Sequence, residues 1–424
     1  MMNKCVQRSS AGAVMALVLG LSAGGYAQTP PAKAPGTPAP AKTPAPAQAK
    51  SARSAEFDRL AREATAAREA NRVDEALGLY EKALKLRPSW DEGYWYVGTL
   101  YYGLDRYTEA RDAFRRVIAA QEAKAAGKPV SNGRVYGMKG LCEFQIKNYE
   151  VALADLQKAR DRGVESEELM SAVRYHTAII MTRLEQYEFA LLNLQAFAQK
   201  GHDAPTVIEA FGLATLRMPL LPSELPADRR EMVLLAGRGS YYQAARLSGP
   251  ARPAFEELAS RYPDSPNVHY AYGVFLLGED PDRALEEFKK ELKQSPGHSW
   301  SMLQIAFEYI KRSDWEAARP WAQQAVDTAP QDFAGRRALG QVLFELGETT
   351  GAIEQLERGV ALAPDSPSLR FVLARAYQKA GRPVDADRER EEFRKLQQAN
   401  RSQQYGAQAV GGIVDTADAP KPQQ

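Results

Sequence analysis

The sequence predicts an all-α protein, built as a right-handed α-solenoid of about nine helix–turn–helix units. Three recurring features of the 424-residue chain carry this prediction: an alanine at near-regular intervals, a small residue about twelve positions before it, and a proline that closes many repeats. The alanines are Ala76, Ala110, Ala152, Ala190, Ala251, Ala284, Ala318, Ala352 and Ala386. The small residues are Ala64, Gly98, Gly140, Ala178, Gly239, Gly273, Ala306, Gly340 and Ala374.

Two helices that cross at small side chains explain this pattern. The small residue of the first helix and the alanine of the second let the two backbones approach closely. A large residue four positions after most alanines, such as Phe114 or Phe288, fills the space beside the crossing. One helix pair cannot bury both of its faces, so neighbouring pairs stack into a continuous core.

The ends of individual helices also have recognisable residues. Gly347 and Gly381 fall at the turn between two helices, where a left-handed backbone is useful. The dipeptides Ser265-Pro266 and Ser366-Pro367 are typical of an N-cap followed by proline in the first helical turn.

This pattern resembles the tetratricopeptide-repeat (TPR) family. The alanines are 34 residues apart between Ala76 and Ala110, and 33 to 34 apart at each step from Ala251 to Ala386. The resemblance covers about nine repeats, from Phe57 to about Gln398, which is most of the chain. It implies a superhelix whose concave face, formed by the first helix of each pair, binds a protein or a peptide.

The composition divides the chain into six segments. Residues 1–27 are typical of a signal peptide: Lys4 and Arg8 precede an apolar run, and cleavage is expected after Ala27. An uncleaved anchor is the alternative for this segment. We expect a Pro/Ala-rich disordered linker at 28–56, a block of about four repeats at 57–204 and an irregular connector with an extra helix at 205–231. A block of about five repeats at 232–400 and a disordered tail at 401–424 follow.

The charge balance and the cysteine count exclude several classes of function. The net charge is +2, and removal of Lys4 and Arg8 with the signal peptide leaves 53 basic and 53 acidic residues. This interleaved, balanced charge argues against nucleic acid and against a polybasic membrane patch. Cys142 would be the single cysteine of the mature chain, so we expect neither an internal disulfide nor a cysteine metal cluster.

We find no motif of an active site. The four histidines, His176, His202, His269 and His298, are far apart and lack metal-ligand spacing. Carboxylates alternate with Lys and Arg along predicted helices, which favours surface ion pairs over a general acid and base. We therefore predict no enzyme, no metal and no cofactor.

The concave groove is the predicted binding site. Residues at the second, fifth, ninth and twelfth positions of a repeat should face it, and exposed aromatic and Arg side chains are frequent interface hot spots. The alternative for the aromatic rings is packing between neighbouring repeats. The candidates are Trp95, Tyr102, Tyr270, Trp300, Phe307, Arg337, Gln341, Phe344, Phe371 and Arg375.

These features together predict a periplasmic or secreted protein of the bacterial cell envelope. We expect a non-catalytic scaffold or adaptor that binds a protein or peptide segment of unknown identity, without a membrane span once the signal peptide is removed. The alternative is an accessory subunit of an envelope enzyme, a peptidase or glycosyltransferase, that acts in trans. Both rest on export and on analogy with the fold.

Overall fold

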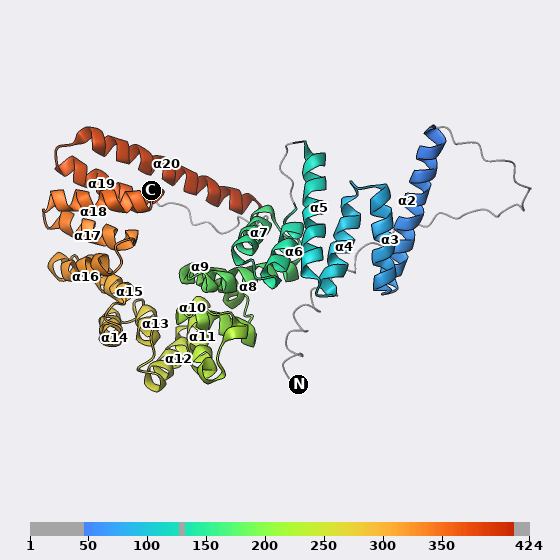
Figure 1. The fold of residues 1–424 in the computed structure, drawn as a ribbon. Helices are drawn as coiled ribbons and strands as arrows, with labels where there is room; N and C mark the ends of the chain where they lie inside the picture. Colours follow the sequence, from blue (N-terminus) through green and yellow to red (C-terminus); the bar gives the residue numbers. More distant parts are fainter. Residues whose placement is uncertain (1–45, 127–131, 411–424) are drawn as a thin grey trace, which may run out of the picture. The chain divides into compact units, whose positions relative to one another are not determined.

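The computed structural model describes residues 46–126 and 132–410 (Figure 1). Within these two ranges the regular elements are all helical, and consecutive helices lie side by side in pairs. This confirms the predicted all-α fold of stacked helix pairs. The predicted signal peptide, the linker up to residue 45 and the tail beyond residue 410 lie outside the described residues. The chain divides into two compact units, unit 1 ending at Leu184 and unit 2 beginning at Glu185.

Unit 1 consists of helices that pack as α2 on α3, α4 on α5 and α6 on α7, with α8 against α7. Its helices are α2 (Pro46–Glu69), α3 (Val73–Leu86), α4 (Asp91–Gly103), α5 (Tyr107–Ala125), α6 (Gly133–Gln145), α7 (Tyr149–Arg162) and α8 (Glu167–Arg183). Helix α2 begins inside the segment 28–56 that we predicted to be a disordered linker. The stretch after Pro46 up to residue 56 contains no further proline or glycine and is rich in alanine, so it extends the first helix.

Unit 2 continues the pairing from α13 on α14 to α19 on α20. Its helices are α9 (Tyr187–Gln199), α10 (Pro205–Thr215), α11 (Arg230–Ala244), α12 (Ser248–Arg261), α13 (Val268–Leu276), α14 (Pro281–Gln294), α15 (Ser299–Lys311), α16 (Trp315–Thr328), α17 (Phe333–Glu345), α18 (Thr349–Leu362), α19 (Pro367–Lys379) and α20 (Pro383–Val410). Helix α20 runs ten residues into the segment that we predicted to be a disordered tail, 401–424. No glycine or proline interrupts it between Pro383 and Gly406.

The segment 205–231, which we predicted to be an irregular connector with an extra helix, contains helix α10 and lies within unit 2. Helix α10 packs against both α9 and α11, and two short 3-10 turns, Pro222–Glu224 and Ala227–Arg229, link it to α11. A methyl group on Gly212 would overlap the backbone oxygen of Val233, and one on Gly237 would overlap that of Ile208. These glycines let α10 and α11 cross at backbone contact. The boundary between the two compact units falls after Leu184, inside the segment 57–204 that we predicted to be one block of repeats.

The repeated small residues form the helix crossings, as predicted. Every one of the nine repeat alanines is fully buried. A methyl group added to Gly98 would lie 2.7 Å from the ring of Phe114, and one added to Gly273 would lie 2.6 Å from Phe288. Each of these glycines therefore provides the space that the large residue of the second helix occupies.

The helix ends follow the predictions with one exception. Gly347 and Gly381 have φ angles of 89° and 72°, as the turn between paired helices requires. Ser366 takes the N-cap position of α19, but its hydroxyl contacts Ser368 Oγ at 3.2 Å and makes no capping hydrogen bond to the backbone. Ser265 is not an N-cap, because Asn267 takes that position of α13 with a left-handed backbone (φ 67°).

No helix in the described ranges combines the length and the apolar character that a bilayer span needs.

Candidate functional site

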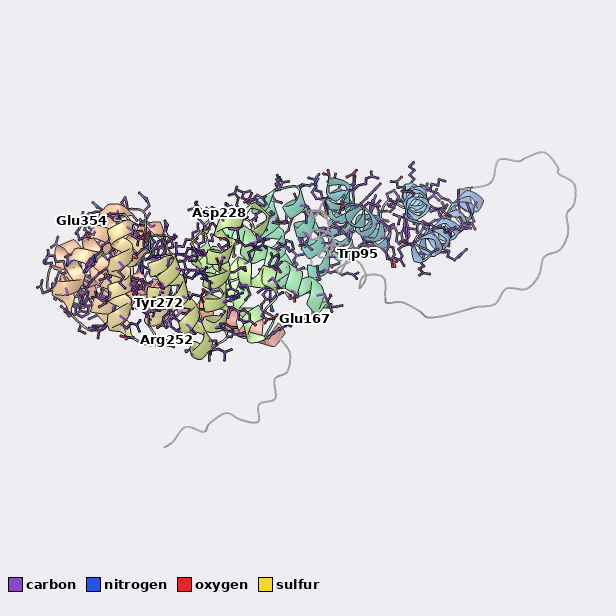
Figure 2. The ribbon with its side chains drawn as sticks, turned by 90° about the horizontal axis from the view of Figure 1, so that it is seen from below. Trp95, Glu167, Asp228, Arg252, Tyr272 and Glu354 are labelled. Carbon is purple, nitrogen blue, oxygen red and sulfur yellow. The ribbon has the colours of Figure 1, made fainter. Side chains whose placement is uncertain are left out.

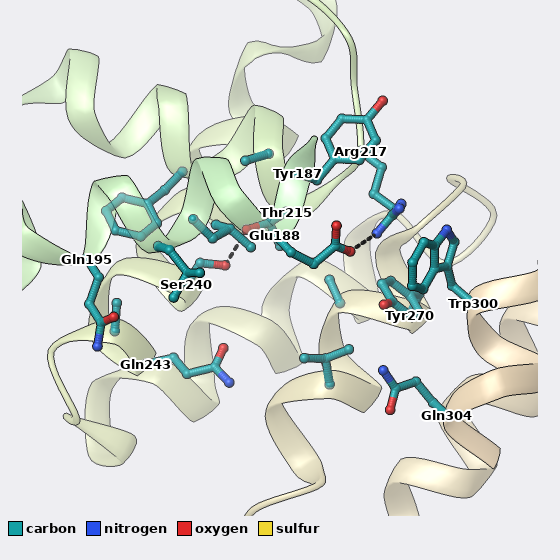
Figure 3. Close-up of a pocket in the computed structure, with 17 residues that line it drawn as sticks. Tyr187, Glu188, Gln195, Thr215, Arg217, Ser240, Gln243, Tyr270, Trp300 and Gln304 are labelled. Carbon is teal, nitrogen blue, oxygen red and sulfur yellow. Dashed lines mark hydrogen bonds and ion pairs between the residues drawn. The ribbon is translucent and has the colours of Figure 1, made fainter. Parts of the chain in front are cut away.

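Unit 2 contains a cavity of about 490 Å³ lined by α9, α10, α11, α13 and α15 (Figure 3). This volume falls in the range of about 300–1,000 Å³ that is usual for ligand pockets. We call this cavity the pocket. Its apolar lining is supplied by Leu191, Leu192, Phe211, Ala214, Ala244, Ala271 and Val274. Leu192 is 62% exposed, so part of this apolar surface is open to solvent.

Arg217 borders the pocket and joins helices that are distant in the sequence (Figure 3). Its φ of 51° directs the chain away from the end of α10. Its guanidinium carbon lies 4.7 Å from the ring centre of Tyr187 and 4.6 Å from that of Trp300. Nη1 donates to Glu188 Oε1 at 2.6 Å. The Arg217 side chain is only 11% exposed, so it is held in place by two rings and a carboxylate.

The remaining polar groups of the pocket are uncharged. Gln195, Gln243 and Gln304 come from three different helices, α9, α11 and α15. Each amide can both donate and accept a hydrogen bond, which matches the N–H and C=O groups of a peptide backbone. Thr215 and Ser240 bond to each other at 2.6 Å between their hydroxyl oxygens. The pocket thus combines an apolar lining with amide groups and one internal ion pair.

A buried polar network fixes the two aromatic walls, Tyr270 and Trp300. Glu291 is fully buried on α14 and accepts hydrogen bonds from the backbone N–H of Asn267 at 2.9 Å and of Tyr270 at 3.2 Å. The backbone N–H of Ser301 donates to His298 Nδ1 at 3.2 Å, and His298 Nε2 lies 3.0 Å from Asn267 Oδ1.

His298 therefore caps α15, the helix that carries Trp300, and is hydrogen-bonded to the start of α13. The rings of His298 and Tyr270 also pack at 4.9 Å between centres. Burial lowers the pKa of His298, and it raises the pKa of Tyr270. Both shifts favour uncharged side chains in this network.

A second set of residues continues along α15, α17 and α19, and we call it the arginine–aromatic row: Phe307, Arg337, Phe344, Arg375 and Lys379. Arg337 stacks over Phe307 at 5.0 Å. Arg375 and Lys379 lie over Phe344 at 4.7 and 4.9 Å. In each case the cation comes from the helix pair that follows the ring. Cation–π contacts of this kind stabilise by roughly 0.5–2 kcal/mol.

The structure corrects the exposure that we predicted for four groove candidates. Trp95, Tyr102, Tyr270 and Phe344 are at most 9% exposed. Packing between repeats covers these rings. In unit 1 the ring of Trp95 (Figure 2) lies against Phe114 at 5.4 Å and under Arg134 of the next helix pair at 4.0 Å.

The other candidates keep some exposure. Trp300, Phe307, Arg337 and Gln341 are partly buried. Phe371 is 49% exposed and Arg375 is also exposed. Trp300 and Tyr270 meet in the pocket, and Phe307, Arg337, Phe344 and Arg375 meet in the arginine–aromatic row. Sequence reasoning missed Tyr187, Glu188, Arg217 and the three glutamines. Three of these residues lie on α9 and Arg217 follows the inserted α10, where the repeat register gives no groove position.

The polar pairs of the described helices are arranged for structure. His269 Nδ1 lies 2.6 Å from Glu287 Oε2, and both side chains are buried between α13 and α14. The thiol of Cys142 is buried, which raises its pKa and suppresses the reactive thiolate. Over residues 46–126 and 132–410, no three His, Cys, Asp or Glu side chains lie together as a metal site requires.

The fold and the site define a class: an α-helical repeat protein with a cavity among stacked helix pairs. The model of the family described as "Tetratricopeptide repeat" matches residues 61–129, 98–167, 237–299, 303–367 and 337–400. Together these matches cover more than half of the chain. The chain therefore belongs to the tetratricopeptide repeat family, whose fold serves protein–protein interaction and is generally non-catalytic.

The similar proteins are more distant. The chain is 25% identical over 155 residues to "Cellulose synthase operon protein C" of Xanthomonas axonopodis pv. citri (strain 306), a match that covers 34% of this chain and 10% of that protein. Among solved structures, a MamA double mutant (RS-1 ArsTM) has 20% identity and a TM-score of 0.38, over 41% of this chain and 97% of that one. MamA of Desulfovibrio magneticus RS-1 has 22% identity and a TM-score of 0.36, again over 41% and 97%.

Proposed function

We propose that the protein is a non-catalytic scaffold of the bacterial cell envelope that binds a peptide segment of a partner protein along unit 2, with the pocket as the main anchor. The pocket is the observation that carries this proposal. It is open, mostly apolar and built on five helices of a fold that serves protein–protein interaction.

The pocket suits a large apolar side chain of the partner. Burial of one Leu or Phe side chain stabilises by about 1.5–3 kcal/mol. The amides of Gln195, Gln243 and Gln304 would bond to the peptide groups on either side of that residue. Arg217 and Glu188 neutralise each other, so they define the wall without attracting a charged anchor.

The envelope location is supported by the sequence of residues 1–27, with its Lys and Arg followed by an apolar run and small residues before Gln28. N-terminal sequencing of the protein from a periplasmic fraction tests this location. A chain that begins at Gln28 agrees with it, whereas a chain that keeps residues 1–27 in the cytoplasm contradicts it.

The second candidate function is an accessory subunit of an envelope enzyme, acting in trans. The observation that favours it is the partial match to a protein named for a cellulose synthase operon. Copurification of a stoichiometric glycosyltransferase with the native protein would favour this candidate over a scaffold between non-enzymatic partners.

Photo-crosslinking from defined positions tests the binding site. A benzophenone amino acid replaces Gln304 at the pocket, and in a parallel sample it replaces the exposed Gln323 on α16. The captured partner is then purified, and its affinity is measured for the wild type, Trp300→Ala and the control Trp315→Ala, which lies outside the pocket lining.

We expect a specific adduct from position 304 only, and affinity at least about tenfold weaker for Trp300→Ala. Equal affinity for all three proteins would contradict the pocket as the anchor.

A further inference from the structure

We propose that unit 2 selects partner segments that carry a carboxylate next to their apolar anchor, and that Arg337 is the residue that binds this carboxylate. The proposal rests on the proposed function, because it names the chemistry of the same peptide partner. It concerns the arginine–aromatic row, which lies on helices α15, α17 and α19.

Among the arginines of α17 and α19, Arg337 is the one without a hydrogen-bond acceptor in the part of the chain that the structure describes. Arg336 donates to the carbonyl oxygen of Pro330 at 3.0 and 2.7 Å and to Gln355 Oε1 at 2.9 Å. Arg370 donates to Glu389 at 2.6 Å, and Arg375 donates to Glu345 at 3.2 Å. Within the described residues, the Arg337 guanidinium contacts the ring of Phe307 and makes no hydrogen bond or ion pair.

An arginine in this state is suited to bind an anion. Its guanidinium is partly withdrawn from water, and burial lowers the pKa of Arg337. The five N–H donors therefore lose hydration without a compensating hydrogen bond. The contact with the Phe307 ring limits where the guanidinium can lie, and its planar fork can bind a carboxylate with two parallel hydrogen bonds.

The surrounding charges favour an acidic ligand as well. Arg375 and Lys379 lie over the neighbouring ring, Phe344, and one carboxylate, Glu345, pairs with Arg375. Lys379 donates to the carbonyl oxygen of Phe344 at 3.2 Å. The row thus contains three cationic side chains, and Glu345 is the carboxylate that pairs with one of them.

An acidic side chain of a peptide fits better than a free phosphate or an anionic polysaccharide. The same helix, α15, carries Phe307 of the row and both Trp300 and Gln304 of the pocket. An extended segment with an apolar residue and an acidic residue would satisfy both sites. A phosphate alone would leave the apolar lining and the glutamine amides unused.

Selection of peptides against the full chain tests the proposal. A library of random 12-residue peptides is selected on the wild-type protein, and one enriched peptide is synthesised with its Asp or Glu intact and with that residue replaced by Asn or Gln. Affinities of both peptides are measured for wild type, Arg337→Gln, Arg337→Lys and Arg358→Gln. Arg358 is the matched control, because it is exposed on α18 and pairs with Glu354. Circular dichroism confirms that the variants are equally helical.

We expect enriched peptides to share an apolar residue and, at a constant spacing, an Asp or Glu. Arg337→Gln should weaken the acidic peptide at least about tenfold but leave the amide peptide unchanged. Arg337→Lys should give an intermediate loss because it keeps the charge without the planar fork. Arg358→Gln should bind like the wild type.

Four results would overturn the proposal, and they differ in their meaning. Two of these results would refute the role of Arg337 and leave the peptide-binding function standing. In the first, the enriched peptides lack an acidic residue. In the second, Arg337→Gln binds both peptides with equal affinity, and as tightly as the wild type does. Failure to enrich any peptide, with Trp300→Ala also without effect on the captured partner, would refute the proposed function itself. Binding of inorganic phosphate or polyglucuronate without peptide enrichment would show that the row takes a non-peptide anion.

Discussion

In both compact units an arginine lies over an aromatic ring of the preceding helix pair, but the two rings differ in how far they are buried. In unit 1, Arg134 lies over Trp95 at 4.0 Å, and the ring is 9% exposed. In unit 2, Arg337 lies over Phe307 at 5.0 Å on a partly buried ring. Unit 2 also contains the inserted helix α10, and the pocket lies beside it. Regular stacking buries the Trp95 ring in unit 1, whereas in unit 2 the inserted helix α10 lines a pocket beside Tyr270 and Trp300.

Replacement of Trp95 or Trp300 by alanine should distinguish a core ring from a ring at the pocket. The largest expected loss of unfolding free energy is for Trp95 in unit 1. Trp95→Ala should cost about 3–5 kcal/mol of unfolding free energy, because it opens a cavity beside Phe114 and Arg134. Trp300→Ala should cost clearly less, because this ring is partly exposed at the pocket. Urea unfolding followed by circular dichroism measures both.

The labelling of Cys142, with Cys5 replaced by Ser, reports on unit 1 during the same titration. Trp95→Ala should expose this thiol at lower urea, since repeats contact mainly their neighbours. Equal destabilisation by both substitutions, or a larger loss for Trp300→Ala, would contradict the contrast between a core ring and a site ring.

The next largest loss of stability is expected where α10 and α11 cross at Gly212 and Gly237. Gly237→Ala should destabilise the protein by about 2–3 kcal/mol and abolish partner binding, because the added methyl group forces α10 away from α11 and distorts the pocket. Gly249→Ala on α12 is the control, since a methyl group there meets no atom within 4 Å. Differential scanning calorimetry measures the loss. Unchanged stability and binding for Gly237→Ala would show that α10 does not shape the pocket.

The smallest predicted effect is a pH dependence that arises from His298. Burial lowers its pKa in the folded state, and Nδ1 must be unprotonated to accept from Ser301. Glu291 opposes this lowering, and Arg217 adds to it. The stabilisation by the cap is therefore complete above the unfolded pKa of about 6.5 and is lost as the pH falls below it. An N-cap contributes about 1 kcal/mol.

A substitution that keeps the cap without the titration isolates this effect. In His298→Asn, the difference in unfolding free energy between pH 7.5 and pH 5.0 should be smaller than in the wild type by about 1 kcal/mol. His202→Asn is the control at an exposed position. His176 in unit 1 also has a pKa lowered by burial, so part of the pH dependence should remain in both variants. Identical pH profiles for the wild type and His298→Asn would rule out the cap as a titrating element.

The spacing of small residues was sufficient to predict the repeats, because each crossing needs a small residue wherever it occurs. The fully buried Ala76 and the contact between Gly98 and Phe114 follow from local spacing alone. The residues of the candidate site were harder to predict from the sequence. Burial of Trp95 depends on Arg134, which the next helix pair supplies across an insertion. Arg217 stands outside the repeat register, and its partners Glu188 and Trp300 are identified only by the packing of α9, α10 and α15.

Hydrogen–deuterium exchange with a bound peptide tests the central claim, that unit 2 and not the equivalent helices of unit 1 holds the partner. The peptide is the acidic one selected on the wild type, and exchange is compared with and without it. We predict slower exchange in α10, α15 and α17 and no change in α4 and α6. Protection confined to α4 and α6, or to the second helices α12, α14 and α16, would contradict the assignment of the binding site to the pocket and the arginine–aromatic row.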